Sequence, residues 1–157
     1  MVISVIFAIT TIVLTIVLVY SFTVYFGVYT ALRRLNVSIS EFEVVEFNTT
    51  HTYIATILTL DNPAAQEFYS IGLEQNTYFN GQYFAFTRPG EPSTYRPMRI
   101  PPQSSFNVTI NTDVPPSKSE MLQEATERNW FTSILVMLES PIVGRFSLRT
   151  SRQVVAS

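Results

Sequence analysis

Residues 105–112 read SFNVTINT, and this stretch decides the fold. Phe106, Val108 and Ile110 alternate with polar residues, and successive side chains of a strand point to opposite faces of its sheet. The pattern therefore predicts a strand with one buried side and one solvent-facing side, on which Asn107 lies. Strands of this kind are typical of antiparallel sheets that pack together through one face.

The sequence on both sides of this strand repeats the same signals. Strands are predicted over 36–47, 51–60, 71–79, 82–87, 130–138 and 145–155, which together with 105–112 makes about seven. Asn80-Gly81 joins two of these runs, and this dipeptide is the strongest short signal for a β-hairpin. The pattern predicts an all-β domain over residues 35–157, a single antiparallel immunoglobulin-like β-sandwich.

One short helix is predicted inside this domain, over residues 117–129. Val114-Pro115-Pro116 ends the preceding strand, and Ser117 with Glu120 fits a capping box. Met121, Leu122 and Ala125 would form its apolar stripe. The large apolar side chains that we expect in the core are Trp130, Phe131, Phe106, Leu58 and Phe146.

The N-terminal segment is uniformly apolar, because no charged residue occurs before Arg33 and Arg34. The run VISVIFAITTIVLTIVLVY (2–20) matches the ~20 residues that cross a bilayer as a helix. The end of this run and the segment that follows contain the aromatic residues Tyr20, Phe22, Tyr25, Phe26 and Tyr29. They are expected either in an aromatic belt at the membrane boundary or against neighbouring helices. We predict a single-pass transmembrane or assembly helix over residues 1–34, with Arg33 and Arg34 marking the membrane exit.

A cleaved secretory signal is the alternative reading of this segment. Such signals begin with a basic region, continue with a shorter apolar core and end at a small-residue cleavage site. Here Met1 is followed directly by apolar residues. A retained anchor in the cell membrane is therefore favoured.

The sequence contains evidence for a cytoplasmic domain and evidence for an extracytoplasmic one. Arg33 and Arg34 after the helix favour a cytoplasmic domain by the positive-inside rule. Three N-glycosylation sequons favour the outside, and they begin at Asn36, Asn48 and Asn107. A domain rich in Thr, Asn and Gln, with one Lys and no Cys, also fits an exposed surface. We favour an extracytoplasmic domain, a glycoprotein if the sequons are occupied.

The composition excludes several kinds of site. The chain has no cysteine, which removes disulfides, thiolate nucleophiles and Cys-type metal sites together. Its single histidine, His51, cannot build a histidine metal cluster, and no partner serine motif accompanies it. The net charge is −2 and the cations are spread out, unlike the footprint of a nucleic-acid binder. We predict no enzymatic activity, no cofactor, no metal and no nucleic-acid partner.

Two clusters of like charge are candidates for ion binding. They are a cationic set, Arg88, Arg96 and Arg99 with Tyr95, and an acidic set, Glu41, Glu43 and Glu46. The arginines lie in a proline-rich loop and could bind a carboxylate, a phosphate or a glycan, but a solvated loop is favoured. The glutamates lack the glycine turn of a calcium loop, so an exposed strand face is favoured.

Five short motifs, taken in order, resemble a known family. They are Asp61-Asn62-Pro63, Tyr78-Phe79-Asn80-Gly81, Ile100-Pro101-Pro102-Gln103-Ser104, Val114-Pro115-Pro116 and Pro141-Ile142-Val143-Gly144-Arg145-Phe146. Over residues 36–155 they are similar to the late-embryogenesis-abundant type-2 domain, also called the water stress and hypersensitive response domain. The resemblance implies a seven-stranded sandwich with a helix at one end and no catalytic residues. It also implies a protein that is soluble or tethered by one helix.

The overall plan is also similar to that of archaeal pilin-like proteins, including archaellins and the archaellum accessory proteins FlaF and FlaG. These proteins place an N-terminal hydrophobic helix before a small sandwich outside the cell. The chain departs from their pattern because no basic processing segment precedes the helix, unless that segment has been removed before this sequence begins. This resemblance implies a non-catalytic structural subunit of a pilus- or archaellum-type surface assembly. Its partners would be membrane lipid and other protein subunits or a surface layer. The alternative is a stand-alone tethered domain with a stress-related or binding role.

Overall fold

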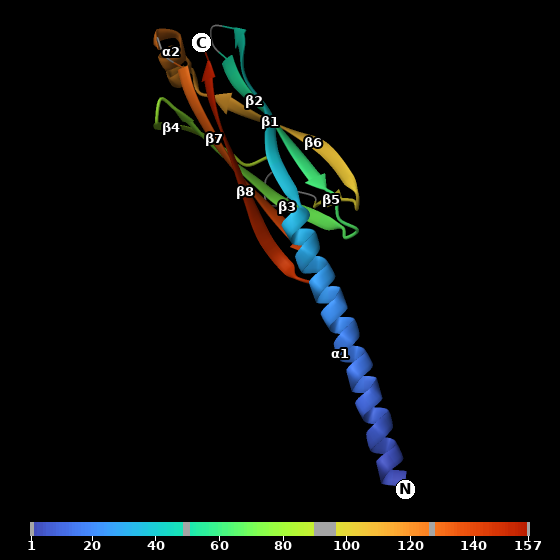
Figure 1. Cartoon of the computed structure of the whole chain (residues 1–157). Coiled ribbons are helices and arrows are strands. Elements are labelled where there is room, and N and C mark those ends of the chain that lie inside the picture. The colour runs from blue at the N-terminus through green and yellow to red at the C-terminus, as the bar shows by residue number, and fades with distance from the viewer. Residues whose placement is uncertain (1, 49–50, 90–96, 126–127, 157) are drawn as a thin grey trace.

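The computed structural model describes residues 2–48, 51–89, 97–125 and 128–156. A single long helix, α1 (Val2–Arg34), leads into the first strand with Leu35 alone between them. Figure 1 shows α1 projecting from one end of an elongated pair of sheets, with the N-terminus at its far tip and the C-terminus at the opposite end of the molecule. The predicted N-terminal helix is confirmed.

Eight strands and one further helix lie in the described part of the chain. They are β1 (Asn36–Asn48), β2 (His51–Asn62), β3 (Phe68–Phe79), β4 (Gln82–Thr87), β5 (Met98–Ile100), β6 (Ser104–Val114), α2 (Pro116–Glu124), β7 (Arg128–Ser140) and β8 (Gly144–Ala156). Sheet A has the order β1-β2-β6, and sheet B the order β4-β3-β7-β8. All of the pairs are antiparallel, so the predicted antiparallel β-sandwich is confirmed.

The strand that was missed from the sequence is β5. It pairs with Phe68–Ser70 at one end of β3, whereas β4 pairs with Gln75–Phe79 at the other end. The three residues of β5 lie between prolines, so the local sequence carries no strand signal. Its pairing depends on the edge of β3, which is a tertiary contact.

The hairpin between β3 and β4 forms as predicted. Asn80 and Gly81 have φ angles of 47° and 79°, and two positive values in succession are what a tight hairpin of this twist requires. The alternation of β6 is also confirmed, with Ile110 buried and Asn107 exposed.

Helix α2 differs from the prediction in its start, its end and its packing face. Its N-cap residue is Pro115, so the expected capping box of Ser117 and Glu120 is wrong. Proline suits the first helical position because the missing amide would have no partner there. The helix ends at Glu124, and Asn129 already belongs to β7. Leu122 is buried, whereas Met121 is exposed.

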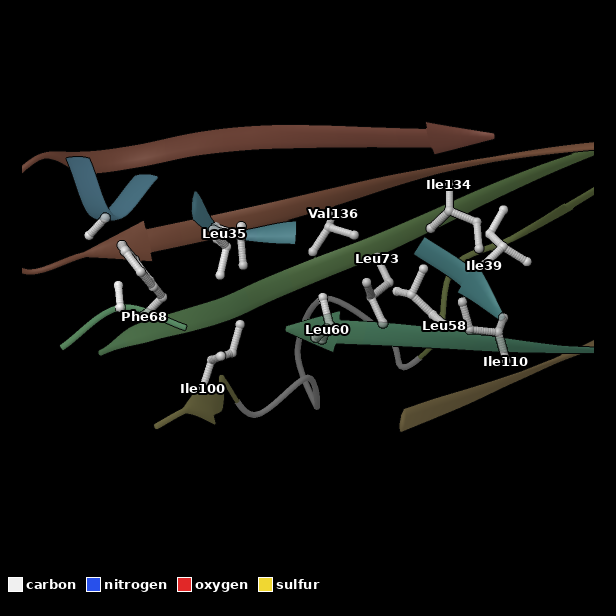
Figure 2. Packing of buried hydrophobic residues seen from close by; sticks show 13 residues of the cluster. Leu35, Ile39, Leu58, Leu60, Phe68, Leu73, Ile100, Ile110, Ile134 and Val136 are labelled. Atoms are coloured by element: carbon white, nitrogen blue, oxygen red, sulfur yellow. The ribbon is translucent and has the colours of Figure 1, made fainter. Parts of the chain in front are cut away.

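The interior of the sandwich contains two apolar clusters. The larger cluster lies at the α1 end and includes Phe68, Leu58 and Ile134, with side chains from both sheets facing one another in Figure 2. The smaller cluster surrounds Trp130, whose ring centroid is 4.6 Å from that of Phe79. The prediction that Leu58 and Trp130 are buried is confirmed.

The other three predicted core aromatics divide into two groups. Phe106 and Phe146 are partly buried against the larger cluster. Phe131 is 41% exposed, so its predicted burial is wrong. Consecutive residues of a strand face opposite ways, and Trp130 takes the inward position.

A band of polar side chains separates the two clusters. Thr56, Thr77, Thr112 and Thr132 are all buried, and each lies between a residue of the larger cluster and a residue of the smaller one. Gln75 of sheet B donates its amide to the Thr56 hydroxyl of sheet A at 2.9 Å. The band therefore links the two sheets by hydrogen bonds across the middle of the core.

Candidate functional site

One face of the last third of α1 packs against the sandwich. Val28, Ala31 and Leu35 are 0%, 4% and 7% exposed, and their spacing places them on one face of the helix. Gly27 lies on the same face, and a Cβ atom built there would be 3.8 Å from the Gln66 side chain. The helix and the domain are thus joined by packing, with no flexible linker between them.

The rest of α1 extends away from the domain. Every residue from 3 to 23 is exposed, and the helix is long and apolar enough to cross a membrane, as a signal sequence would also be. Threonine hydroxyls of α1 donate hydrogen bonds to the backbone carbonyl four residues earlier. The donors are Thr10, Thr11, Thr15, Thr23 and Thr30. The helix can therefore carry threonine in lipid without an unpaired hydroxyl.

Four of the predicted aromatic residues form one stripe on α1. At about 100° per residue, Phe22, Tyr25, Phe26 and Tyr29 lie on the face opposite the buried Ala31. We call these four residues the helix stripe. Each of them is at least 60% exposed, and the Phe22 and Phe26 rings are stacked with their centroids 6.1 Å apart.

The fifth predicted aromatic residue, Tyr20, is 71% exposed and lies on the docked side of the helix below the domain. The predicted exit residues Arg33 and Arg34 form the last turn of α1 and are exposed. The aromatic and basic residues thus surround the junction between the helix and the sandwich.

A groove runs along the helix stripe. It measures about 320 Å³ and is lined by the four stripe residues, by Leu32 and by Val143. Val143 belongs to the turn between β7 and β8, and Figure 1 shows this end of the two strands beside the junction with α1. Two segments far apart in the sequence therefore share one apolar surface.

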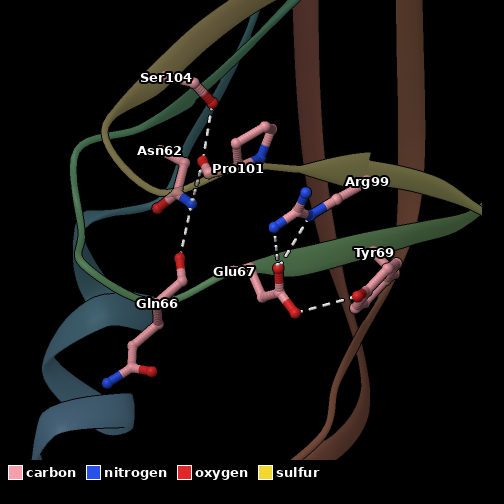
Figure 3. A network of polar contacts seen from close by, with 7 residues as sticks. All are labelled: Asn62, Gln66, Glu67, Tyr69, Arg99, Pro101 and Ser104. Atoms are coloured by element: carbon pink, nitrogen blue, oxygen red, sulfur yellow. Dashed lines mark hydrogen bonds and ion pairs between the residues drawn. The ribbon is translucent and has the colours of Figure 1, made fainter.

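A polar network holds the loops that receive the helix (Figure 3). The fully buried Asn62 donates its amide to the carbonyls of Gln66 at 2.8 Å and Pro101 at 2.9 Å. The backbone amide of Ala64 donates to the side-chain oxygen of Asn62 at 3.2 Å. Ser104 also donates to the Pro101 carbonyl. Asn62 thus fixes the loop after β2 to the turn after β5, next to the docked face of α1.

An ion pair lies beside this network. Arg99 donates to the Glu67 carboxylate at 2.9 Å, and the Tyr69 hydroxyl donates to its other oxygen at 3.0 Å. These hydrogen bonds, the one from Arg99 first, hold the pKa of Glu67 below its ordinary value of 4.5. The bond to the carboxylate raises the pKa of Tyr69, because it stabilises the protonated hydroxyl.

A row of aromatic side chains crosses the outer face of sheet B at the end remote from α1. Tyr83, Tyr78 and Phe131 are register neighbours on β4, β3 and β7, and both adjacent pairs of ring centroids are 5.8 Å apart. We call these three residues the sheet B row. Tyr83 is 55% exposed, and Phe86 beside the row is 49% exposed. The sequence prediction missed this surface because it assigned Phe131 to the core.

Two of the three sequon asparagines are exposed in the structure. Asn36 begins β1, and Asn107 lies on the outer face of β6, where its side chain accepts a hydrogen bond from Thr59 at 2.9 Å. Asn48 ends β1, but its side chain and the two threonines after it lie outside the described residues. The structure therefore leaves Asn36 and Asn107 accessible to modification.

The predicted cationic cluster does not form a shared anion site in the described part of the chain. Arg88 pairs with Glu74, whereas Arg99 pairs with Glu67. Arg96 and Tyr95 lie outside the described residues.

The acidic set lies along β1. Glu41 and Glu43 are exposed, as expected for a solvated strand face, and the side chain of Glu46 is not among those described. His51 begins β2, and its side chain also lies outside the described part. Among the residues that the structure does describe, no group of three or more His, Asp or Glu side chains is placed to hold a metal.

No protein-family model matches this sequence, and no curated protein matches it. Among solved structures, a protein from Archaeoglobus fulgidus is similar in fold, with a TM-score of 0.51 and 12% identity over 78% of this chain and 98% of that one. A protein from Arabidopsis thaliana has a TM-score of 0.55 and 12% identity over 76% and 79% of the two chains.

A candidate late embryogenesis abundant protein is also similar, at a TM-score of 0.47 and 14% identity over 78% of this chain and 70% of that one. This TM-score is too low to show a shared fold. At these identities, the likenesses to the archaeal and plant proteins show that the fold is shared, and they show the fold alone.

Proposed function

We propose that this chain is a non-catalytic structural protein of the cell surface, anchored in the membrane by α1 and acting through contacts of its sandwich with partner subunits. The observation that carries the proposal is the continuity of α1 with the core. Val28 and Ala31 are buried in the sandwich, while residues 3–23 of the same helix are exposed and uncharged. Such a helix joins the domain directly to its membrane anchor, with no flexible segment between the two.

The length of the exposed segment supports a membrane span. Residues 3–22 extend ~30 Å at ~1.5 Å per residue, which equals the hydrocarbon thickness of a typical bilayer. The apolar core of a secretory signal has 7–15 residues, fewer than this exposed segment contains. A retained anchor therefore suits the helix better than a cleaved signal.

The docking of α1 on the sandwich limits which part of the chain a partner subunit can contact. The sequence left the aromatic residues from Tyr20 to Tyr29 either at the membrane boundary or against neighbouring helices. In the structure, Val28 and Ala31 of the same part of the helix are buried against the chain's own sandwich. We therefore assign the partner contact to the sandwich.

The sheet B row is the surface that we assign to this contact. Tyr and Phe are enriched in the buried centres of protein interfaces, because their rings supply contact area at small entropic cost. The row lies where β3 and β7 pair beside β4, and Figure 1 shows β4 at the end of the sandwich that contains α2, away from α1. A partner subunit or a surface layer above the membrane would meet this end.

The finer assignment, to a pilus- or archaellum-type assembly with the domain outside the cell, rests on architecture. A hydrophobic helix precedes a small sandwich in this chain as in archaeal pilin-like proteins, and Asn36 and Asn107 are exposed as glycan sites require. The alternative is a stand-alone tethered domain of the late-embryogenesis-abundant kind. It is favoured by Asn62 and Pro101, which belong to two of the resembling motifs and are hydrogen-bonded to each other.

Chemical cross-linking in native membranes tests the proposal. The wild-type chain should appear in a cross-linked species larger than the monomer, and Tyr83→Ala/Phe131→Ala should lose that species while remaining in the membrane fraction. Asn111→Ala, on the exposed face of sheet A, is the matched control and should keep it. A wild-type chain that stays monomeric would contradict assembly and leave the tethered domain.

A further inference from the structure

The turn between β7 and β8 exposes apolar side chains where turns usually carry polar ones. Ile142 and Val143 are 40% and 46% exposed, and Pro141 precedes them. The turn has a defined shape, because the amide of Ile142 donates to the Ser140 hydroxyl at 3.3 Å and Gly144 has a φ angle of +80°. We refer to Pro141-Ile142-Val143 as the apolar turn.

The apolar turn continues the exposed surface of the membrane helix. Val143 lines the same groove as Tyr25, Tyr29 and Leu32 of α1. The lining of this groove is almost entirely apolar. The helix and the turn therefore form one surface at the base of the sandwich.

The length of the helix places this surface relative to a bilayer. If residues 3–22 fill the hydrocarbon, the headgroup zone of roughly 5–7 Å covers about the next four residues. This zone begins beyond Phe22 and ends before Tyr29, so it contains Tyr25. Val143 lines the groove that extends from Phe22 to Leu32, so the apolar turn lies beside the stretch of helix that contains Tyr25.

The charged residues nearest the apolar turn limit how deeply it can enter. Glu139 and Arg145 are cross-strand partners on β7 and β8, one step back from the turn. An apolar tip followed by a charged pair matches the boundary between acyl chains and headgroups, where apolar side chains enter lipid and charges stay in water. Arg33 and Arg34 at the end of α1 provide further charges above that boundary.

We propose that the apolar turn is a second membrane contact, which inserts Ile142 and Val143 into the headgroup–acyl boundary beside α1. The partner is the lipid bilayer itself. A helix alone leaves the domain free to rotate and tilt about its axis, whereas two contacts fix the sandwich against the membrane. This inference rests on the proposed anchoring by α1.

Single-cysteine labelling tests the contact, because the chain contains no native cysteine. The full-length chain would be reconstituted into phosphatidylcholine vesicles with an environment-sensitive fluorophore at Val143→Cys. The two references are Val13→Cys in the middle of the exposed helix and Asn111→Cys on the outer face of β6. Each label would be quenched separately by aqueous iodide and by lipids that carry a nitroxide at a shallow or a deep position.

We expect the Val143→Cys label to be quenched by the shallow nitroxide and protected from iodide, the Val13→Cys label by the deep nitroxide, and the Asn111→Cys label by iodide. If Val143→Cys responds to iodide as Asn111→Cys does while Val13→Cys stays in the bilayer, the turn proposal is overturned and the anchor stands. If Val13→Cys also responds to iodide, the proposed anchoring itself fails. A Val143→Cys label that neither quencher reaches is covered by protein, and this result also overturns the lipid contact.

Discussion

Asn62 and Pro101 lie 39 positions apart in the sequence, and the side-chain amide of Asn62 donates to the Pro101 carbonyl at 2.9 Å. The bond joins the end of β2, in sheet A, to the turn that follows β5, in sheet B. The same amide also donates to Gln66, whose side chain lies next to Gly27 of α1. One buried asparagine therefore couples the two sheets at the place where the helix docks.

Replacing this asparagine should destabilise the whole chain. Asn62→Ala leaves the Gln66 carbonyl and the Ala64 amide without their partner, while the Pro101 carbonyl keeps only its bond from Ser104. Buried polar groups left unpaired cost about 1–3 kcal/mol each. We expect the free energy of unfolding to fall by about 2–4 kcal/mol. The loss is not larger because neighbouring water will satisfy some of these groups. Urea unfolding of the detergent-solubilised chain, followed through the single buried Trp130, measures this loss.

Ser104→Ala is the matched control for that measurement. The Ser104 hydroxyl donates to the same Pro101 carbonyl but is near the surface. Its removal should cost less than about 1 kcal/mol, since water can replace it. Equal effects of the two variants would contradict the role given to Asn62.

The ion pair at the base of the sandwich should make stability depend on pH in the acidic range. Because the folded pKa of Glu67 lies below its ordinary value of 4.5, the carboxylate stabilises the fold fully above that pH. This contribution is lost as the pH falls through the lower folded value. The wild-type chain should therefore be more stable than Glu67→Gln at pH 7, and the difference should shrink below pH 4.5. A difference in urea midpoint that does not change with pH would exclude this explanation.

Gly72 lies at an irregularity of β3 where a side chain would meet Met137. A Cβ atom built on Gly72 would be 2.4 Å from the terminal methyl of Met137, closer than such atoms approach. Gly72→Ala should lower the free energy of unfolding by at most about 1 kcal/mol, because the flexible end of the half-buried methionine can move aside. In a Met137→Ala background the same change should cost less, and a double-mutant cycle of unfolding free energies measures the difference. Independent, additive effects would show that no such contact exists.

The domain should lie outside the cell. On intact cells, a membrane-impermeant maleimide should label Asn111→Cys, whose side chain is exposed on the outer face of β6, and lysis should add little further labelling. Labelling that appears only after lysis would place the sandwich in the cytoplasm, as Arg33 and Arg34 alone would suggest. The cysteine-free wild-type chain gives the background.

The strands could be predicted because their signals are local. The alternation at Phe106 and Val108 and the Asn80-Gly81 hairpin both appear in the structure as expected. Phe131 could not be placed in the same way. Trp130 and Phe131 are adjacent aromatics. Which of the two faces the core depends on how β7 pairs with β3 and β8, and the sequence of β7 alone does not specify this pairing.

The docking face of α1 was also hidden from sequence analysis. An amphipathic helix reveals its buried face by contrast between polar and apolar sides, but α1 is apolar on all sides. Its docked face differs mainly in the small size of Gly27 and Ala31, which lets the sandwich approach. The groove shared with Val143 depends on the β7–β8 hairpin folding back to the helix, a contact between the two ends of the chain.

The intact mass of the mature chain, purified from native membranes, tests the central claim most directly. If α1 is a retained anchor that continues into the core, the chain in the membrane fraction will still contain residues 3–34. It will also resist extraction by alkaline carbonate. A mature chain that begins beyond the exposed segment and is recovered in the soluble fraction would identify α1 as a cleaved signal and contradict the account.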